Sequence, residues 1–238
     1  MMFRRIVLYY WKFRYQWLRR KWNRSAKRSV LNGIALMFHH VTDDYVDINE
    51  SCKCKVVRFE EILKQYIYQK RRFVSVDKML DFIKSKNSTP FVVVTFDDVP
   101  DNFYSNAYPI LKRYRIPFVL FITTGYIGQP GYLSESQIKE LDKEELCTIG
   151  AHTVSHPMLR QLHDCSSELV DSKIILEQLL GHRVDFMAYP YGRQSSVSQT
   201  VMLKAKEAGY LCSFGTIQAP ITDLSSNNLF YIPRIVEK

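Results

Sequence analysis

Acidic residues are missing from the first 42 positions of this 238-residue chain, and the first carboxylate is that of Asp43. Ten of the 33 Lys and Arg residues lie within positions 1–30, which leaves 23 basic and 24 acidic residues for the rest. The formal charge of +9 therefore belongs to the N-terminal arm, and the body is close to neutral. Because the body carries no basic excess, we expect no nucleic-acid partner.

Cysteines with the spacing of a disulfide framework are missing too. The five cysteines are odd in number and irregularly spaced: Cys52, Cys54, Cys147, Cys165 and Cys212. We therefore expect reduced thiols in a cytoplasmic protein. Cys52 and Cys54 are as close as a metal-binding pair, but no second pair completes a structural zinc site.

The arm, residues 1–32, lacks the features of a signal peptide and of a transmembrane segment. Its apolar run 6–11 is short, is followed by Lys12, and precedes no small-residue cleavage site. Apolar residues recur at spacings of three and four, which predicts a basic amphipathic helix. All three tryptophans lie here, and aromatic with basic residues suit the headgroup zone of an anionic membrane. We expect peripheral attachment at the inner face of the cell membrane; packing on the body or on a partner protein is the alternative.

The body, residues 33–238, alternates apolar runs with helical patterns and contains no repeat or linker, so we expect one domain. The runs expected as strands are 34–38, 91–96, 117–123, 147–151, 184–189, 211–216 and 230–235. The helical patterns are 59–69, 76–83, 102–114, 134–144, 167–180 and 198–208. Buried parallel strands separated by helices predict an α/β fold, as a barrel or an incomplete barrel.

Two carboxylates follow one of these runs at its C-terminal end, where the catalytic groups of barrel enzymes gather. Asp97 and Asp98 come directly after the run 91–96. Strand alternation sends the two side chains in different directions, so one can bind a cation while the other acts as a base. Taken alone, an Asp-Asp pair is commonly a turn or a helix cap.

Two histidines follow a second run in the same way. His152 comes directly after the run 147–151, and His156 is four residues further on. In a helical turn, this spacing would bring both imidazoles to one side. Alone, such a spacing is often a coincidence; with one carboxylate, the two histidines form a ligand set typical of zinc or non-haem iron.

Three segments resemble the motifs of the NodB-type polysaccharide deacetylases, carbohydrate esterase family 4. They are 95–98 (Thr-Phe-Asp-Asp), 152–157 (His-Thr-Val-Ser-His-Pro) and 188–192 (Ala-Tyr-Pro-Tyr-Gly). Residues 36–41 (Leu-Met-Phe-His-His-Val) are similar to the branch that acts on N-acetylglucosamine polymers. The resemblance covers about residues 33–238. It implies a distorted, TIM-like (β/α)7 barrel that removes N-acetyl, sometimes O-acetyl, groups from sugars with a divalent metal ion, usually zinc.

Carried over by motif, the resemblance also implies roles for individual residues. Asp97 would be the general base, and Asp98, His152 and His156 would be the metal ligands. The backbone N–H of Tyr191 would help to stabilise the oxyanion.

The chain departs from the family pattern at several points. Val99 replaces the glycine that commonly follows the first motif, and Ala188 stands where many members carry an arginine that pairs with the catalytic aspartate. No histidine follows His182, so the late histidine that often acts as general acid is missing. We hypothesise that Arg234, near the expected last motif, takes over the partnership with Asp97.

The sequence therefore predicts a metal-dependent hydrolase that deacetylates an N-acetylhexosamine in a polysaccharide or a lipid-linked saccharide. Protonated Asp97, His39 or His40 would protonate the leaving amine. Tyr189 and Tyr191 would offer a stacking face for a sugar or pack as part of the barrel wall. Two alternatives stay open: a related metal-dependent amidohydrolase acting on a small amide, and a degenerate, non-catalytic saccharide-binding barrel.

Overall fold

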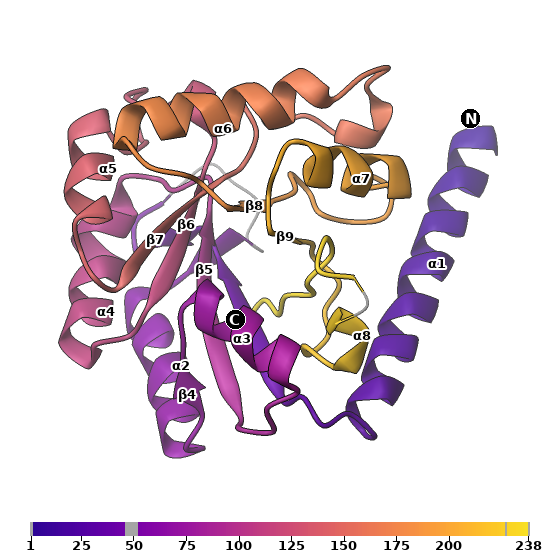
Figure 1. Ribbon diagram of the computed structural model, residues 1–238, viewed down its shortest axis with the longest axis horizontal. Helices are drawn as coiled ribbons and strands as arrows, with labels where there is room; N and C mark the ends of the chain where they lie inside the picture. Colours follow the sequence, from indigo (N-terminus) through magenta and orange to yellow (C-terminus); the bar gives the residue numbers. More distant parts are fainter. Residues whose placement is uncertain (1, 46–51, 227, 238) are drawn as a thin grey trace.

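A curled parallel sheet forms the centre of the computed structural model, which describes residues 2–45, 52–226 and 228–237 (Figure 1). Its path runs β1 (Gly33–Phe38), β5 (Phe91–Asp97), β6 (Phe118–Ile122), β7 (Cys147–Ala151), β8 (Phe186–Ala188) and β9 (Cys212–Phe214). The short β4 (Arg72–Phe73) pairs with β5, and every pairing in this sheet is parallel. Six of the seven predicted runs coincide wholly or in part with strands of this path.

The seventh run bridges the two ends of the sheet. Ile232 forms an isolated parallel bridge with Phe214 of β9, and Ile235 forms one with Leu36 of β1. The segment between them therefore occupies the position of a last barrel strand. The predicted α/β class, with a distorted and incompletely regular barrel, is confirmed.

Helices surround the sheet at all six predicted patterns (Figure 1). They are α2 (Val56–Tyr68), α3 (Val76–Ser85), α4 (Tyr108–Tyr114), α5 (Glu135–Asp142), α6 (Ser166–Leu180) and α7 (Gln199–Glu207). Serine side chains cap three of them, at Ser75, Ser134 and Ser198. Gly181, with φ of 79°, ends α6 as expected from its freedom to adopt the left-handed conformation.

Several short elements were not predicted. They are β2 (His40–Val41), β3 (Lys53–Cys54), β4 (Arg72–Phe73), η3 (Thr124–Tyr126), η4 (Leu159–Gln161) and α8 (Asp223–Ser226). Elements of two to four residues are too short to produce a hydrophobic period, so the sequence pattern carries no signal for them. The π-helical turn η2 (Phe103–Ala107) forms the first part of the helix predicted over 102–114.

Alternate residues of the strands pack into two separate clusters, as strand geometry requires. One cluster lies between the sheet and its helices and includes Leu36, Val94 and Leu120. The other includes Ala35 and Val93 from the opposite faces of the same strands, together with residues of α3. Burial on both faces explains why the sequence shows continuous apolar runs instead of alternation.

The arm contains the helix α1 (Met2–Ala26), which lies beside α7 and α8 (Figure 1). One of its faces packs on the body: Trp22 belongs to the core, and the Tyr15 hydroxyl accepts a hydrogen bond from the Gln218 N–H at 3.2 Å. Within the described residues, no helix combines the length and the apolar character needed to cross a membrane. The division into an arm and a barrel at residue 33 stays a prediction.

Candidate metal centre

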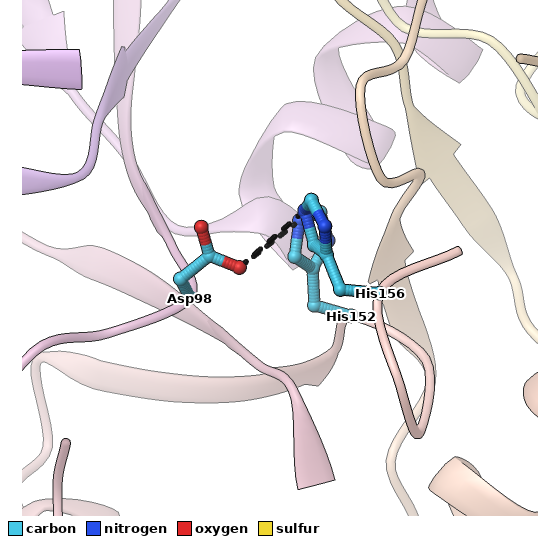
Figure 2. Close-up of side chains that lie close together, drawn as sticks. All are labelled: Asp98, His152 and His156. Atoms are coloured by element: carbon cyan, nitrogen blue, oxygen red, sulfur yellow. Dashed lines mark ion pairs between the residues drawn. The ribbon is translucent and has the colours of Figure 1, made fainter. Parts of the chain in front are cut away.

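Three side chains predicted as metal ligands converge at the C-terminal ends of β5 and β7 (Figure 2). The Oδ1 atom of Asp98 lies 3.8 Å from Nε2 of His152 and 3.5 Å from Nε2 of His156. The three ligand atoms all lie within 4.8 Å of one another, and no other such group occurs in the described part of the chain. A tetrahedral zinc ion separates its ligand atoms by about 3.4 Å, so the group fits a divalent ion of this size.

The segment that carries the two histidines is not helical, so the helical turn expected for them was wrong. Residues 152–158 form an irregular loop, in which Thr153 and His156 have φ values of 69° and 58°. The carboxylate of Glu168, at the start of α6, accepts hydrogen bonds from two successive N–H groups of this loop at 2.9 Å and from the Ser155 hydroxyl at 2.6 Å. Glu168 was missed in the sequence because it belongs to no motif and acts only through this contact.

His152 is oriented by a hydrogen bond to the backbone of the neighbouring strand. Its Nδ1 lies 2.8 Å from the carbonyl oxygen of Ala188. Because a carbonyl oxygen only accepts, Nδ1 carries the proton and the lone pair of Nε2 faces Asp98. Burial also lowers the pKa of His152 and favours the neutral imidazole that binds metals. The Thr123 hydroxyl holds Asp98 from another side, at 3.2 Å from Oδ1.

The backbone around the carboxylates is strained. Asp98 and Val99 have φ values of 60° and 52°, and the Val99 N–H donates to the carbonyl of Asp97 at 2.6 Å, which closes a tight three-residue turn. A second turn of this kind centres on Tyr191, with φ of 59°. A positive φ is rare for a β-branched residue, whereas glycine adopts it freely. Val99 therefore occupies, at a conformational cost, a position that suits the glycine common in the family.

Asp97 is paired with Arg234, as hypothesised from the sequence. The guanidinium makes a bidentate contact, with both N···O distances at 2.6 Å, and both side chains are buried. Arg234 also donates to the carbonyl of Gly215 at 3.0 Å and to the Thr95 hydroxyl at 3.1 Å. Burial alone would raise the pKa of Asp97, but Arg234, together with His152, holds it below its usual value. The carboxylate is therefore ionised and ready to accept a proton.

The two tyrosines of the third motif have different positions. Tyr189 is fully buried, and its hydroxyl donates to the carbonyl of Phe230 at 3.0 Å, so it belongs to the barrel wall and offers no stacking face. Tyr191 is half-exposed, with its ring centroid 4.8 Å from that of His156. Among the described residues, no acceptor faces the N–H of Tyr191, which leaves it available to a ligand.

The two adjacent histidines, His39 and His40, also differ. Nδ1 of His40 lies 2.9 Å from the amide nitrogen of Asn102, so this side chain holds the His40 ring. His39 interacts with the charges of Asp97 and Asp98, which raise its pKa, while its burial lowers the pKa more strongly. Of the two, His39 is therefore the one that shares the site with the expected base.

The fold and the site together define a curled barrel with a ligand set of two histidines and one carboxylate at its C-terminal rim. The sequence profile of the polysaccharide deacetylases matches residues 84–212, more than half of the chain. The chain belongs to this family, as its three motifs predicted.

The relatives support this assignment. Poly-beta-1,6-N-acetyl-D-glucosamine N-deacetylase from Staphylococcus aureus (strain MRSA252) is 29% identical over 198 residues, which cover 75% of this chain and 66% of the relative. The chain thus spans just under two thirds of the length of that relative. Among solved structures, the deacetylase PplD of Streptococcus pyogenes, in complex with acetate, has a TM-score of 0.74 at 25% identity. IcaB from Ammonifex degensii has the same fold, with a TM-score of 0.75 at 23% identity. Each match covers 87% of this chain and 92% of the other.

The ligand group predicts a specific effect on metal binding. Replacing His156 by Asn removes one of three ligands while keeping a residue that tolerates a left-handed φ. We expect the affinity for zinc to fall by about 100-fold or more, measured by calorimetric titration of the metal-free protein. His182→Asn is the matched control, because this exposed histidine pairs with Asp142 outside the site. Equal affinities in the two variants would remove His156 from the ligand set.

Proposed function

We propose that the protein is a metal-dependent deacetylase that removes the N-acetyl group of an N-acetylhexosamine in a polysaccharide or a lipid-linked saccharide. The convergence of Asp98, His152 and His156 beside the ionised Asp97 is the observation that carries this proposal. The name of the Staphylococcus aureus relative supports the substrate class. The donor set, two imidazoles and one carboxylate, suits zinc.

Each polar group of the site has a distinct task in this reaction. Asp98, His152 and His156 would hold a divalent ion, whose Lewis acidity would polarise the acetamide carbonyl and make a water more acidic. Asp97, kept ionised by Arg234, takes the proton of the attacking water. The N–H of Tyr191 donates to the oxygen that becomes negatively charged. The proton that Asp97 has taken then passes to the leaving amine, and His39 can relay it, since it lies beside Asp97 and no other described residue engages its ring in a hydrogen bond.

Two other functions fit the chain less well. A degenerate, non-catalytic barrel was favoured by the missing arginine at Ala188, but Arg234 now fills that place beside Asp97. A small amide remains an alternative substrate, because the ligand set alone does not select a sugar. Acetate release from N-acetylated saccharides, compared with release from acetamide, distinguishes the two substrates.

The role of Asp97 is tested by Asp97→Asn in the zinc-loaded protein. The amide cannot accept the water proton, so we expect turnover to fall by about 10²–10⁴-fold while zinc stays bound. The measurement is acetate release from oligosaccharides of β-1,6-linked N-acetylglucosamine and from an N-acetylated lipid-linked saccharide. Asp101→Asn, at an exposed position near the site, is the control. Similar turnover in the two variants would show that Asp97 is not the base.

The role of Arg234 is tested through the pH profile of kcat/KM. The guanidinium lowers the pKa of Asp97, so its removal in Arg234→Met should raise that pKa and move the acid limb of the profile to higher pH. Arg234→Lys keeps the positive charge and should move the limb less. Thermal unfolding of both variants verifies that they fold. An acid limb that stays in place in Arg234→Met contradicts the pairing as a determinant of activity.

We further propose that the protein lies at the cytoplasmic face of the membrane, attached through the face of α1 that points away from the barrel. Tyr9, Phe13 and Trp17 follow one another at spacings of four and are 79%, 68% and 54% exposed. The helix contains basic residues and no acidic one. Exposed aromatic rings beside cations are typical of helices that lie in the headgroup zone.

The membrane proposal is tested by co-sedimentation with vesicles. We expect the wild type to bind vesicles containing phosphatidylglycerol and not those of phosphatidylcholine alone, with weaker binding as salt is added. The double variant Phe13→Ser/Trp17→Ser should lose most of this binding. The control is Tyr45→Ser/Tyr68→Ser, which removes two exposed aromatic side chains elsewhere. Equal sedimentation of the two variants would exclude this face of α1.

A further inference from the structure

A pocket of about 490 Å³ lies between α1 and the body. Arg14, Leu18 and Trp22 of α1 form one wall, and the opposite wall contains Arg160 of η4 and the first residues of α7. Figure 1 shows why the two walls meet, since α1 runs beside α7. None of the metal ligands or other residues assigned to catalysis lines this pocket.

Two arginine side chains, those of Arg14 and Arg160, line the pocket without a carboxylate partner. Arg14 and Arg160 have their guanidinium carbons 5.9 Å and 4.5 Å from the centroid of the same Trp11 ring. Arg14 donates to the Tyr10 hydroxyl and Arg160 to the carbonyl of Gln194, both at 2.9 Å, and neither pairs with an acidic group in the described part of the chain. The pocket lining contains no Asp or Glu. Two like charges beside one ring repel each other, and an anion between them would relieve that repulsion.

Further hydrogen-bond donors to a ligand come from the backbone at the start of α7. The Ser198 side chain accepts from the N–H of Val201, whereas the N–H groups of Gln199 and Thr200 find no acceptor among the described residues. Both residues line the pocket. Free N–H groups at a helix N-terminus, together with two guanidinium groups, provide more donors than a carboxylate accepts and suit the oxygens of a phosphate group.

The same pocket contains a hydrogen-bond acceptor that has no partner. Oε1 of Gln194 is buried and has no hydrogen-bond partner within the described residues. A buried acceptor of this kind needs a donor, and a turn of the Gln194 side chain, which lines the pocket, would present it to a hydroxyl group of a ligand. Leu18 and Trp22 add an apolar wall that a phosphate ion alone would not use.

We propose that this pocket binds the phosphate ester of a polyol, with the phosphate between Arg14 and Arg160 and a hydroxyl group on Gln194. Such a group occurs both in soluble sugar or glycerol phosphates and in the headgroups of glycerophospholipids. The site shares no residue with the metal centre. Its occupant would hold α1 to the body, since the two arginines come from the two sides of the pocket.

The pocket also contacts a loop of the metal centre. Tyr231, which lines the pocket, donates from its hydroxyl to the carbonyl of Gly192 at 2.5 Å, next to Tyr191. The Tyr15 hydroxyl of α1 lies 3.5 Å from the carbonyl of Thr216, whose own hydroxyl bonds to the Tyr191 carbonyl at 2.9 Å. Ligand binding between α1 and the body would thus stabilise the loop that presents the Tyr191 N–H.

The test is calorimetric titration of sn-glycerol 3-phosphate into the full-length, zinc-loaded protein. We expect saturable binding, at least tenfold tighter than that of inorganic phosphate, because the polyol uses Gln194 and the apolar wall. Arg14→Gln and Arg160→Gln should each weaken the ester by roughly tenfold or more. Arg19→Gln removes an equal charge from α1 outside the pocket and should change nothing. Unfolding midpoints without ligand verify that the variants fold.

The outcomes separate the possible sources of the ester. If vesicles of phosphatidylglycerol displace glycerol phosphate, a lipid headgroup occupies the site; if they do not, the occupant is soluble. Absence of saturable binding, or an equal loss in Arg19→Gln and Arg160→Gln, would overturn the proposal. Equal affinity for inorganic phosphate and the ester would overturn its polyol part. None of these measurements uses turnover, so they test the phosphate site separately from the proposed deacetylase activity.

Discussion

A buried ion pair between Asp97 and Arg234 is the interaction on which the rest of the site depends. Both side chains are removed from water, and removing one partner of such a pair costs about 3–5 kcal/mol, because the other charge is left uncompensated. Arg234 comes from the C-terminal segment that bridges β9 and β1. The same contact therefore joins the closure of the barrel to the charge state of the expected base.

Packing around this pair gives it a defined geometry. The rings of Phe121 and Phe214 lie 5.7 and 6.0 Å from the guanidinium carbon, on strands either side of the barrel interior. Gly150 leaves room for Phe121, since a Cβ atom there would lie 2.6 Å from that ring. A rigid interior of this kind can hold the unfavourable φ values at Asp98 and Tyr191, and such strain is common at functional sites.

The N-terminal helix α1 adds two further surfaces to the barrel. One face of α1 packs through Trp22 and Tyr15, and the other presents Phe13 and Trp17 to the surroundings. The family assignment rests on the barrel, whereas the proposed membrane attachment and the proposed phosphate site rest on α1. A chain that brings a saccharide-processing site to a lipid surface would use both parts, because a lipid-linked substrate must be reached where it lies.

The sequence alone was enough to predict the seven strand positions and the six main helices, because apolar periodicity is a local property. Its short motifs also placed Asp97, Asp98, His152 and His156 at strand ends, and the structure brings these side chains together. It predicted the wrong local conformation between the two histidines, where Glu168 holds an irregular loop. Only the tertiary structure decided that Tyr189 is buried while Tyr191 is half-exposed, and which aromatic residues of α1 face outward. The pairing of Asp97 with Arg234, 137 positions apart, was a hypothesis until the closed barrel brought them together. Local pattern encodes which residues are buried, but their partners depend on how distant strands meet.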